Sequence, residues 1–80
     1  MSLDQALPGR ALRVVAVQGA EGVRRRLLAL GFHVGAVVEV NARGILRGPL
    51  LIKNLTSDTS LALGRSVARK IQVEYSTDGP

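Results

Sequence analysis

The sequence has few residues that could carry out catalysis or hold a metal. It contains one histidine and no cysteine, and its six acidic residues are spread along 80 positions. A metal site needs several ligands close together, and a nucleophilic serine needs a base beside it. The sequence shows neither pattern, and Gly19 and Gly22 lack the lysine and hydroxyl residue of a phosphate-binding loop. We therefore expect a protein that is not an enzyme and has no cofactor.

His33 is the weak candidate for a metal ligand. A single histidine, without a second histidine or a carboxylate at ligand spacing, is most often a solvated loop residue. A site shared between molecules, with Asp58 or Glu39 as a further ligand, stays open at this stage.

The chain is basic, with eleven Lys and Arg against six Asp and Glu and a formal net charge of +5. Nucleic-acid-binding surfaces usually combine cations with aromatic side chains on which bases stack. Here the aromatic residues are Phe32 and Tyr75. Phosphate contacts alone would give weak, salt-sensitive binding. Non-specific nucleic-acid binding is therefore the alternative function, and a protein partner is the main expectation.

Length and hydropathy predict one soluble domain over residues 1–80. A chain of this size forms a single core, which we place at about residues 7–75, with residues 1–5 as a polar lead-in and both ends flexible. No apolar run approaches the roughly 18–20 residues of a membrane span, and no signal peptide is recognisable. The lack of cysteine suits a reducing cytoplasm.

One amphipathic helix is predicted at about residues 22–30. At about 100° per residue, one face carries the apolar side chains of Ala20, Val23, Leu27 and Leu30. Arg25 and Arg26 are predicted to point away from this face. We therefore expect the apolar face to lie on the core and the arginines to lie in solvent.

Gly31 is predicted to end this helix, because glycine adopts the left-handed backbone conformation without steric cost. Phe32 would then fold back on Leu27, a contact that often accompanies such an end. Arg24 and Leu28 fall at the border of the apolar face. Leu28 is therefore either partly buried or exposed for a partner.

The rest of the chain has the pattern of short strands. We predict strands at residues 11–18, 36–43, 50–55, 61–63 and 70–75, and one helical turn at 64–69. Consecutive valines in the first segment indicate either a strand covered on both faces or a bulge. The class is therefore mainly β, a small bent antiparallel barrel with one inserted helix. Its predicted core is formed by Val14, Leu27, Leu30, Val38, Val40, Ile52, Leu63, Ile71 and Val73.

Four segments follow one another in a distinctive order. They are Leu-Pro-Gly at 7–9, Arg-Leu-Leu-Ala-Leu-Gly-Phe at 26–32 with a further Gly at 35, Gly-Pro at 48–49, and Leu-Ala-Leu, Val-Ala and Ile-Gln-Val within 61–73. With these segments the sequence resembles the FeoA family, small cytoplasmic proteins of bacterial ferrous iron transport, over about residues 3–74. The resemblance implies an SH3-like β-barrel with a helical insertion, which agrees with the prediction from the pattern.

The resemblance also implies a partner, the membrane-embedded transporter FeoB, which the protein would bind and modulate through its cytoplasmic GTP-binding region. The protein would then lie in the cytoplasm, at the inner face of the membrane through its partner, without spanning the membrane itself; weak self-association is a further expectation. The candidate contact residues are Arg25, Arg26, Leu28, Arg43, Ile45, Leu46 and Arg47. Ile45 and Leu46 could equally fold back and close one end of the barrel. The family name refers to iron and a transition metal transport system, and it does not imply that this subunit itself binds the metal.

Overall fold

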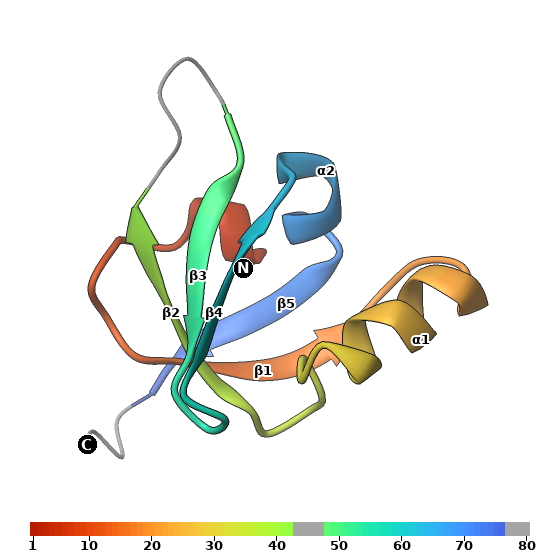
Figure 1. Ribbon diagram of the computed structural model, residues 1–80, viewed down its shortest axis with the longest axis horizontal. Coiled ribbons are helices and arrows are strands. Elements are labelled where there is room, and N and C mark those ends of the chain that lie inside the picture. The colour runs from red at the N-terminus through yellow and green to blue at the C-terminus, as the bar shows by residue number, and fades with distance from the viewer. Residues whose placement is uncertain (43–47, 77–80) are drawn as a thin grey trace.

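The computed structural model describes residues 1–42 and 48–76 of the chain. Within these residues, five strands form one antiparallel sheet in the order β4-β3-β2-β1-β5. The elements follow one another as η1 (Leu3–Gln5), β1 (Leu12–Val17), α1 (Glu21–Ala29), β2 (Val37–Ala42), β3 (Leu50–Asn54), β4 (Thr59–Leu63), α2 (Arg65–Ala68) and β5 (Ile71–Tyr75). The predicted class, with one helix inserted after the first strand, is confirmed. Figure 1 shows the curled sheet and the helix α1 projecting to one side of it.

No helix in the described part of the chain is long and apolar enough to cross a membrane.

Two irregularities in strand pairing bend the sheet. The register of β1 with β5 shifts between Val14 and Ala16, and the register of β2 with β3 shifts between Val40 and Ala42. Such bulges leave one residue unpaired and increase the local twist, which lets a short sheet curl. Val15, the residue skipped in β1, is exposed. Of the two explanations for the consecutive valines, the bulge is therefore the one observed.

The core lies inside the curl of the sheet. Its buried apolar residues are Leu3, Ala6, Leu12, Val14, Leu27, Phe32, Ala36, Val38, Val40, Leu50, Ile52, Leu63, Ala68, Ile71 and Val73. Every residue of the predicted core is among them except Leu30, which is 41% exposed.

The first residues of the chain belong to this core, so their interpretation as a polar lead-in is wrong. Leu3 is fully buried. Val73 donates its backbone N–H to the carbonyl oxygen of Met1 at 2.8 Å, and the Met1 amino group donates to the Val73 carbonyl at 3.2 Å. Ser2 pairs with Gln72. One apolar residue among polar neighbours is too short a signal to predict this pairing, which depends on where β5 lies.

The end of α1 is confirmed as predicted. Phe32 donates its backbone N–H to the carbonyl of Leu27 at 2.9 Å, and Gly31 donates to that of Leu28 at 3.0 Å. These are the two hydrogen bonds of a Schellman motif, and Gly31 has the positive φ, +95°, that the motif requires. Phe32 and Leu27 are both buried. This end of the helix is therefore anchored in the core.

Candidate functional site

An apolar cleft of about 550 Å³ lies between α1 and the segment formed by β4 and α2. Val23, Arg26, Leu27 and Leu30 line it from the helix. Leu63 and Val67 line it from the barrel. The cleft exists because α1 is anchored at its C-terminal end, while its first turns stand away from the barrel (Figure 1).

The apolar face of α1 packs on the core only in part, at Leu27 and Val23, and it also lines this cleft, which corrects the prediction for Ala20 and Leu30. Leu27 is the one residue of α1 that is buried, Val23 is half-buried, and Ala20 and Leu30 are exposed. The helix has nine residues; Leu27 is buried in the core and Val23 packs against it in part, while Ala20 and Leu30, at the two ends of the helix, are exposed.

Arg26 is exposed, as predicted, but it also lines the cleft, so it lies at the border of the apolar face and does not point away from it. Val23, Arg26, Leu27 and Leu30 are separated by three, four and seven positions, the spacings that share one helix face. The cleft thus has an apolar interior with a cation on its wall.

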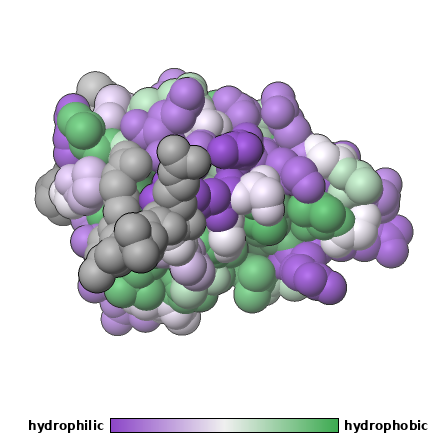
Figure 2. Space-filling view, turned by 90° about the horizontal axis from the view of Figure 1, so that it is seen from above, coloured by the Kyte–Doolittle hydropathy of each residue, from purple (hydrophilic) through white to green (hydrophobic). Residues whose placement is uncertain are grey.

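The other side of α1 is exposed as the proposed contact requires. Leu28 is 50% exposed. Arg25 lies 3.5 Å from Glu21 in an ion pair between two exposed side chains, a type of pair that contributes little to stability. Figure 2 shows green apolar and purple hydrophilic side chains side by side over the α1 end of the molecule, at the right. The role of Arg25 and Leu28 in binding stays a prediction.

The remaining predicted contact residues, Arg43, Ile45, Leu46 and Arg47, lie outside the described residues. The alternative prediction, that Ile45 and Leu46 close one end of the barrel, concerns these same residues and stays a prediction.

Asn54, at the end of β3, links the exit of α1 to the turn between β3 and β4. It is 1% exposed and is the one buried polar residue of the described chain. Its Nδ2 donates to the carbonyl of Gly31 at 3.0 Å, and its Oδ1 accepts from the backbone N–H groups of Thr56 at 3.0 Å and Ser57 at 3.2 Å. The role of Asn54 was not predicted from the sequence. An asparagine directly before a polar turn is the available signal, because its side chain can bond backbone groups two or three residues on.

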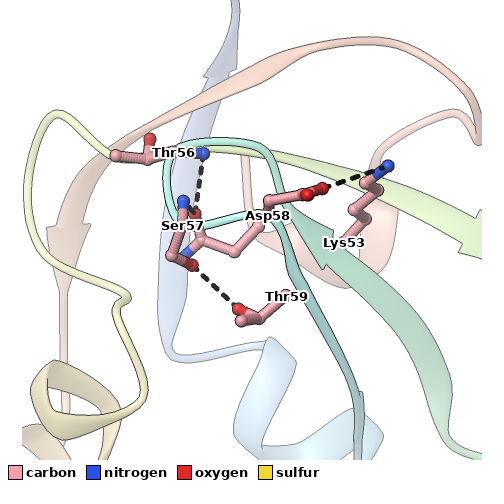
Figure 3. Close-up of polar contacts among 6 residues, drawn as sticks. Lys53, Thr56, Ser57, Asp58 and Thr59 are labelled. Carbon is pink, nitrogen blue, oxygen red and sulfur yellow. Dashed lines mark hydrogen bonds and ion pairs between the residues drawn. The ribbon is translucent and has the colours of Figure 1, made fainter.

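Side chains of the turn itself complete this link, as Figure 3 shows. The hydroxyl groups of Ser57 and Thr59 lie 2.8 Å apart, and the Lys53 Nζ lies 3.7 Å from a carboxylate oxygen of Asp58. Asp58 has a positive φ of 56°, a conformation that aspartate tolerates in tight turns. The turn therefore holds the first residues of β4 in register with β3, so that the strand begins at Thr59 instead of the predicted residue 61.

His33 lies exposed after the helix, with its Nδ1 3.1 Å from the carbonyl oxygen of Val34. Across residues 1–42 and 48–76, no group of three or more His, Cys, Asp and Glu side chains could hold a metal ion. Asp58, named as a ligand of a site shared between molecules, is in an ion pair with Lys53. Metal binding by His33 stays a prediction.

Comparison with protein families assigns the chain to a family. Residues 1–75 match the FeoA domain. The chain belongs to the FeoA domain family. Members of the family are associated with ferrous iron transport. A search of curated proteins finds no relative of this FeoA domain.

Solved structures agree with the family and with the fold. FeoA of Stenotrophomonas maltophilia, a prokaryotic SH3 domain protein in complex with zinc, is 32% identical with a TM-score of 0.79 over 92% of this chain and 89% of that one. An iron uptake regulatory FeoA protein is 26% identical with a TM-score of 0.80, over 92% and 93% of the two chains. FeoA of Chlorobium tepidum is 28% identical with a TM-score of 0.78, over 94% and 70%. The predicted SH3-like barrel is thus confirmed.

The same fold occurs as part of larger proteins. A manganese-dependent transcriptional repressor reaches a TM-score of 0.84 at 21% identity, where this chain covers 36% of the repressor. At this identity the similarity shows the fold alone.

Proposed function

We propose that this FeoA domain is a cytoplasmic, non-enzymatic accessory protein that binds the ferrous iron transporter FeoB at its cytoplasmic GTP-binding region and modulates it. The observation that supports binding is the exposure of α1. A nine-residue helix in a small domain buries Leu27 alone and leaves Leu28 and Leu30 half in water. Apolar side chains gathered on one projecting element gain most when a partner covers them.

The positive charge of α1 and of the whole chain favours a partner with an acidic surface. Arg24, Arg25 and Arg26 follow one another on α1, and the whole chain has a net charge of +5. Such a surface attracts an acidic protein surface and speeds the encounter, while the covered leucines hold the complex together. Binding to FeoB should therefore weaken only moderately when salt is raised. Binding through phosphate contacts to nucleic acid would fall steeply.

The experiment is a titration of the purified chain with the isolated cytoplasmic GTP-binding domain of FeoB from the same organism, at about 50 and 300 mM salt. Leu28→Asp places a charge in the interface, and we expect it to weaken binding at least about tenfold. Leu7→Asp is the matched control, because Leu7 is 55% exposed and lies outside α1. Thermal unfolding of both variants verifies that they are folded.

Equal binding by wild type and Leu28→Asp would remove the Leu28 side of α1 from the interface. Failure of the wild type to bind the GTP-binding domain at either salt concentration, together with retention on bulk DNA or RNA, would favour the nucleic-acid alternative.

A further inference from the structure

The two edge strands of the sheet, β5 and β4, differ in whether their outer edge is paired. The outer edge of β5 is covered, because Met1 and Ser2 pair with it. β4 pairs with β3 on one side. Among the described residues, no other backbone segment is hydrogen-bonded to residues 59–63. The outer edge of β4 is therefore an unpaired strand edge.

The hydrogen bonds of β3 determine which backbone groups face β4. Leu55 donates its N–H to the carbonyl of Val37 at 2.8 Å, so the backbone groups of Leu55 point toward the β2 side. Successive residues of a strand point their backbone groups in opposite directions. The N–H and C=O groups of Asn54 and Ile52 therefore point toward β4.

The same alternation assigns the groups of β4. Thr59 and Leu61 lie opposite Asn54 and Ile52 and bond to them. Ser60 and Ala62 alternate with these two residues along β4. Their N–H and C=O groups therefore point outward, away from β3. Both residues are exposed. Four backbone groups on this edge are thus available to another strand.

β4 has none of the features by which strand edges are usually protected. Its sequence, Thr-Ser-Leu-Ala-Leu, contains no charge and no proline. Its register with β3 runs without a shift over five residue pairs. Natural sheets protect free edges with lysine, proline, bulges or a covering segment. An edge without them is suited to pairing with another chain.

The unpaired edge runs beside the cleft. Ala62, Leu63 and Gly64 line the cleft from the barrel, opposite Val23 and Leu27 of α1. A strand added to β4 would lie along the mouth of the cleft, and one of its alternating side chains would reach inside. The cleft volume of about 550 Å³ accommodates a large apolar side chain.

One arginine on the wall of the cleft predicts the charge of a bound segment. Arg26 lines the cleft, and no carboxylate of the described residues lies within ion-pairing distance of it. Arginine pairs in two-point geometry with carboxylates. An acidic residue near the apolar one would therefore fit this end of the cleft.

We propose that β4 and the cleft bind an extended segment of a protein partner, which joins the sheet as an additional strand, places an apolar side chain in the cleft and an Asp or Glu near Arg26. In this binding mode the backbone hydrogen bonds supply affinity, and the pocket selects the side chain. The inference rests on the proposed function, because the segment would belong to the GTP-binding region of the transporter.

The test is Ala62→Pro. Proline removes the outward N–H that an added strand would use and leaves the bonds between β3 and β4 intact, since Ala62 makes none of them. Ala62→Ser is the matched control, because serine keeps the N–H and is close in size. We expect Ala62→Pro to weaken binding to the isolated GTP-binding domain at least about tenfold, and Ala62→Ser to stay within about twofold.

Amide hydrogen exchange of the wild-type protein is the second measurement, and it does not depend on the folding of the proline variant. The amides of Ser60 and Ala62 should exchange fast in the free protein and slowly in the complex.

The outcomes separate this inference from the proposed function. Equal binding by wild type and a folded Ala62→Pro, with fast amides at 60 and 62 in the complex, overturns the strand addition and leaves the proposed function standing. No binding by the wild type overturns both. A concentration-dependent dimer that Ala62→Pro dissociates, with binding to the GTP-binding domain unchanged, would assign the edge to a second copy and also overturn the proposal.

Discussion

Replacing Asn54 with alanine should destabilise the domain far more than its place beside a surface turn suggests. The change removes one hydrogen bond to the Gly31 carbonyl and two from the N–H groups of Thr56 and Ser57. Because the side chain is 1% exposed, water does not reach its position in the native structure. The exit of α1 and the turn before β4 would therefore lose their shared support.

The expected change in the free energy of unfolding can be estimated from these three hydrogen bonds. The Gly31 carbonyl is partly buried, and leaving it without its donor costs about 1–3 kcal/mol. The two N–H groups belong to exposed residues, and their loss adds about 0.5–1 kcal/mol together because water can replace the acceptor. We expect a decrease of about 2–4 kcal/mol in the free energy of unfolding, against a total of roughly 4–12 kcal/mol for a domain of this size.

A double-mutant cycle with Gly31 isolates the contact itself. A Cβ at position 31 would lie 2.7 Å from the Asn54 Nδ2, closer than real Cβ contacts permit, in addition to the strain of a φ of +95°. Gly31→Ala should therefore be more destabilising in the wild type than in the Asn54→Ala background, where only the strain of about 1–2 kcal/mol remains. We expect the two changes to be less than additive by about 1–2 kcal/mol.

The assay is urea unfolding followed by circular dichroism, with Asn41→Ala as the control. Asn41 is an exposed asparagine in β2, and its replacement should change stability by less than about 0.5 kcal/mol. Strict additivity of the Gly31 and Asn54 changes would show that the close approach is not what requires glycine at position 31. A loss below about 1 kcal/mol for Asn54→Ala would refute the argument from its buried hydrogen bonds.

Three further predictions concern the core and its covering segments. In urea unfolding, Leu27→Ala should lower the free energy of unfolding by about 2–5 kcal/mol because Leu27 is buried. Leu28→Ala, at the exposed neighbouring position, should change it by less than about 0.5 kcal/mol. Equal effects of the two changes would contradict the orientation of α1. Leu3→Ala should also lower the free energy of unfolding by about 2–5 kcal/mol, and a neutral result would return the first residues to a lead-in outside the core. Tyr75→Phe removes the hydroxyl that accepts the N–H of Leu7 at 3.1 Å, and a loss of about 0.5–1.5 kcal/mol is expected in thermal or urea unfolding; no loss would mean that water replaces this bond fully.

Features that depend on neighbours along the chain could be predicted from the amino-acid sequence. The helix at 22–30, its end at Gly31 and the return of Phe32 onto Leu27 could all be predicted, because they follow from backbone sterics and from side chains three to five positions apart. The strand periodicity around Val38 and Val40 likewise identified their buried faces, since alternation is a local property.

Which surfaces remain open to solvent depends on contacts between segments that are distant in the sequence. Helical periodicity shows that Leu27 and Leu30 share a face, but it does not show that the barrel ends before it reaches Leu30. The burial of Leu3 and the outward edge of β4 depend on which strand lies beside which, and the hydrogen bonds of Asn54 join segments 23 residues apart. Contacts between distant segments are set by the closure of the whole sheet, and for this reason the cleft and the free edge could not be predicted from local pattern.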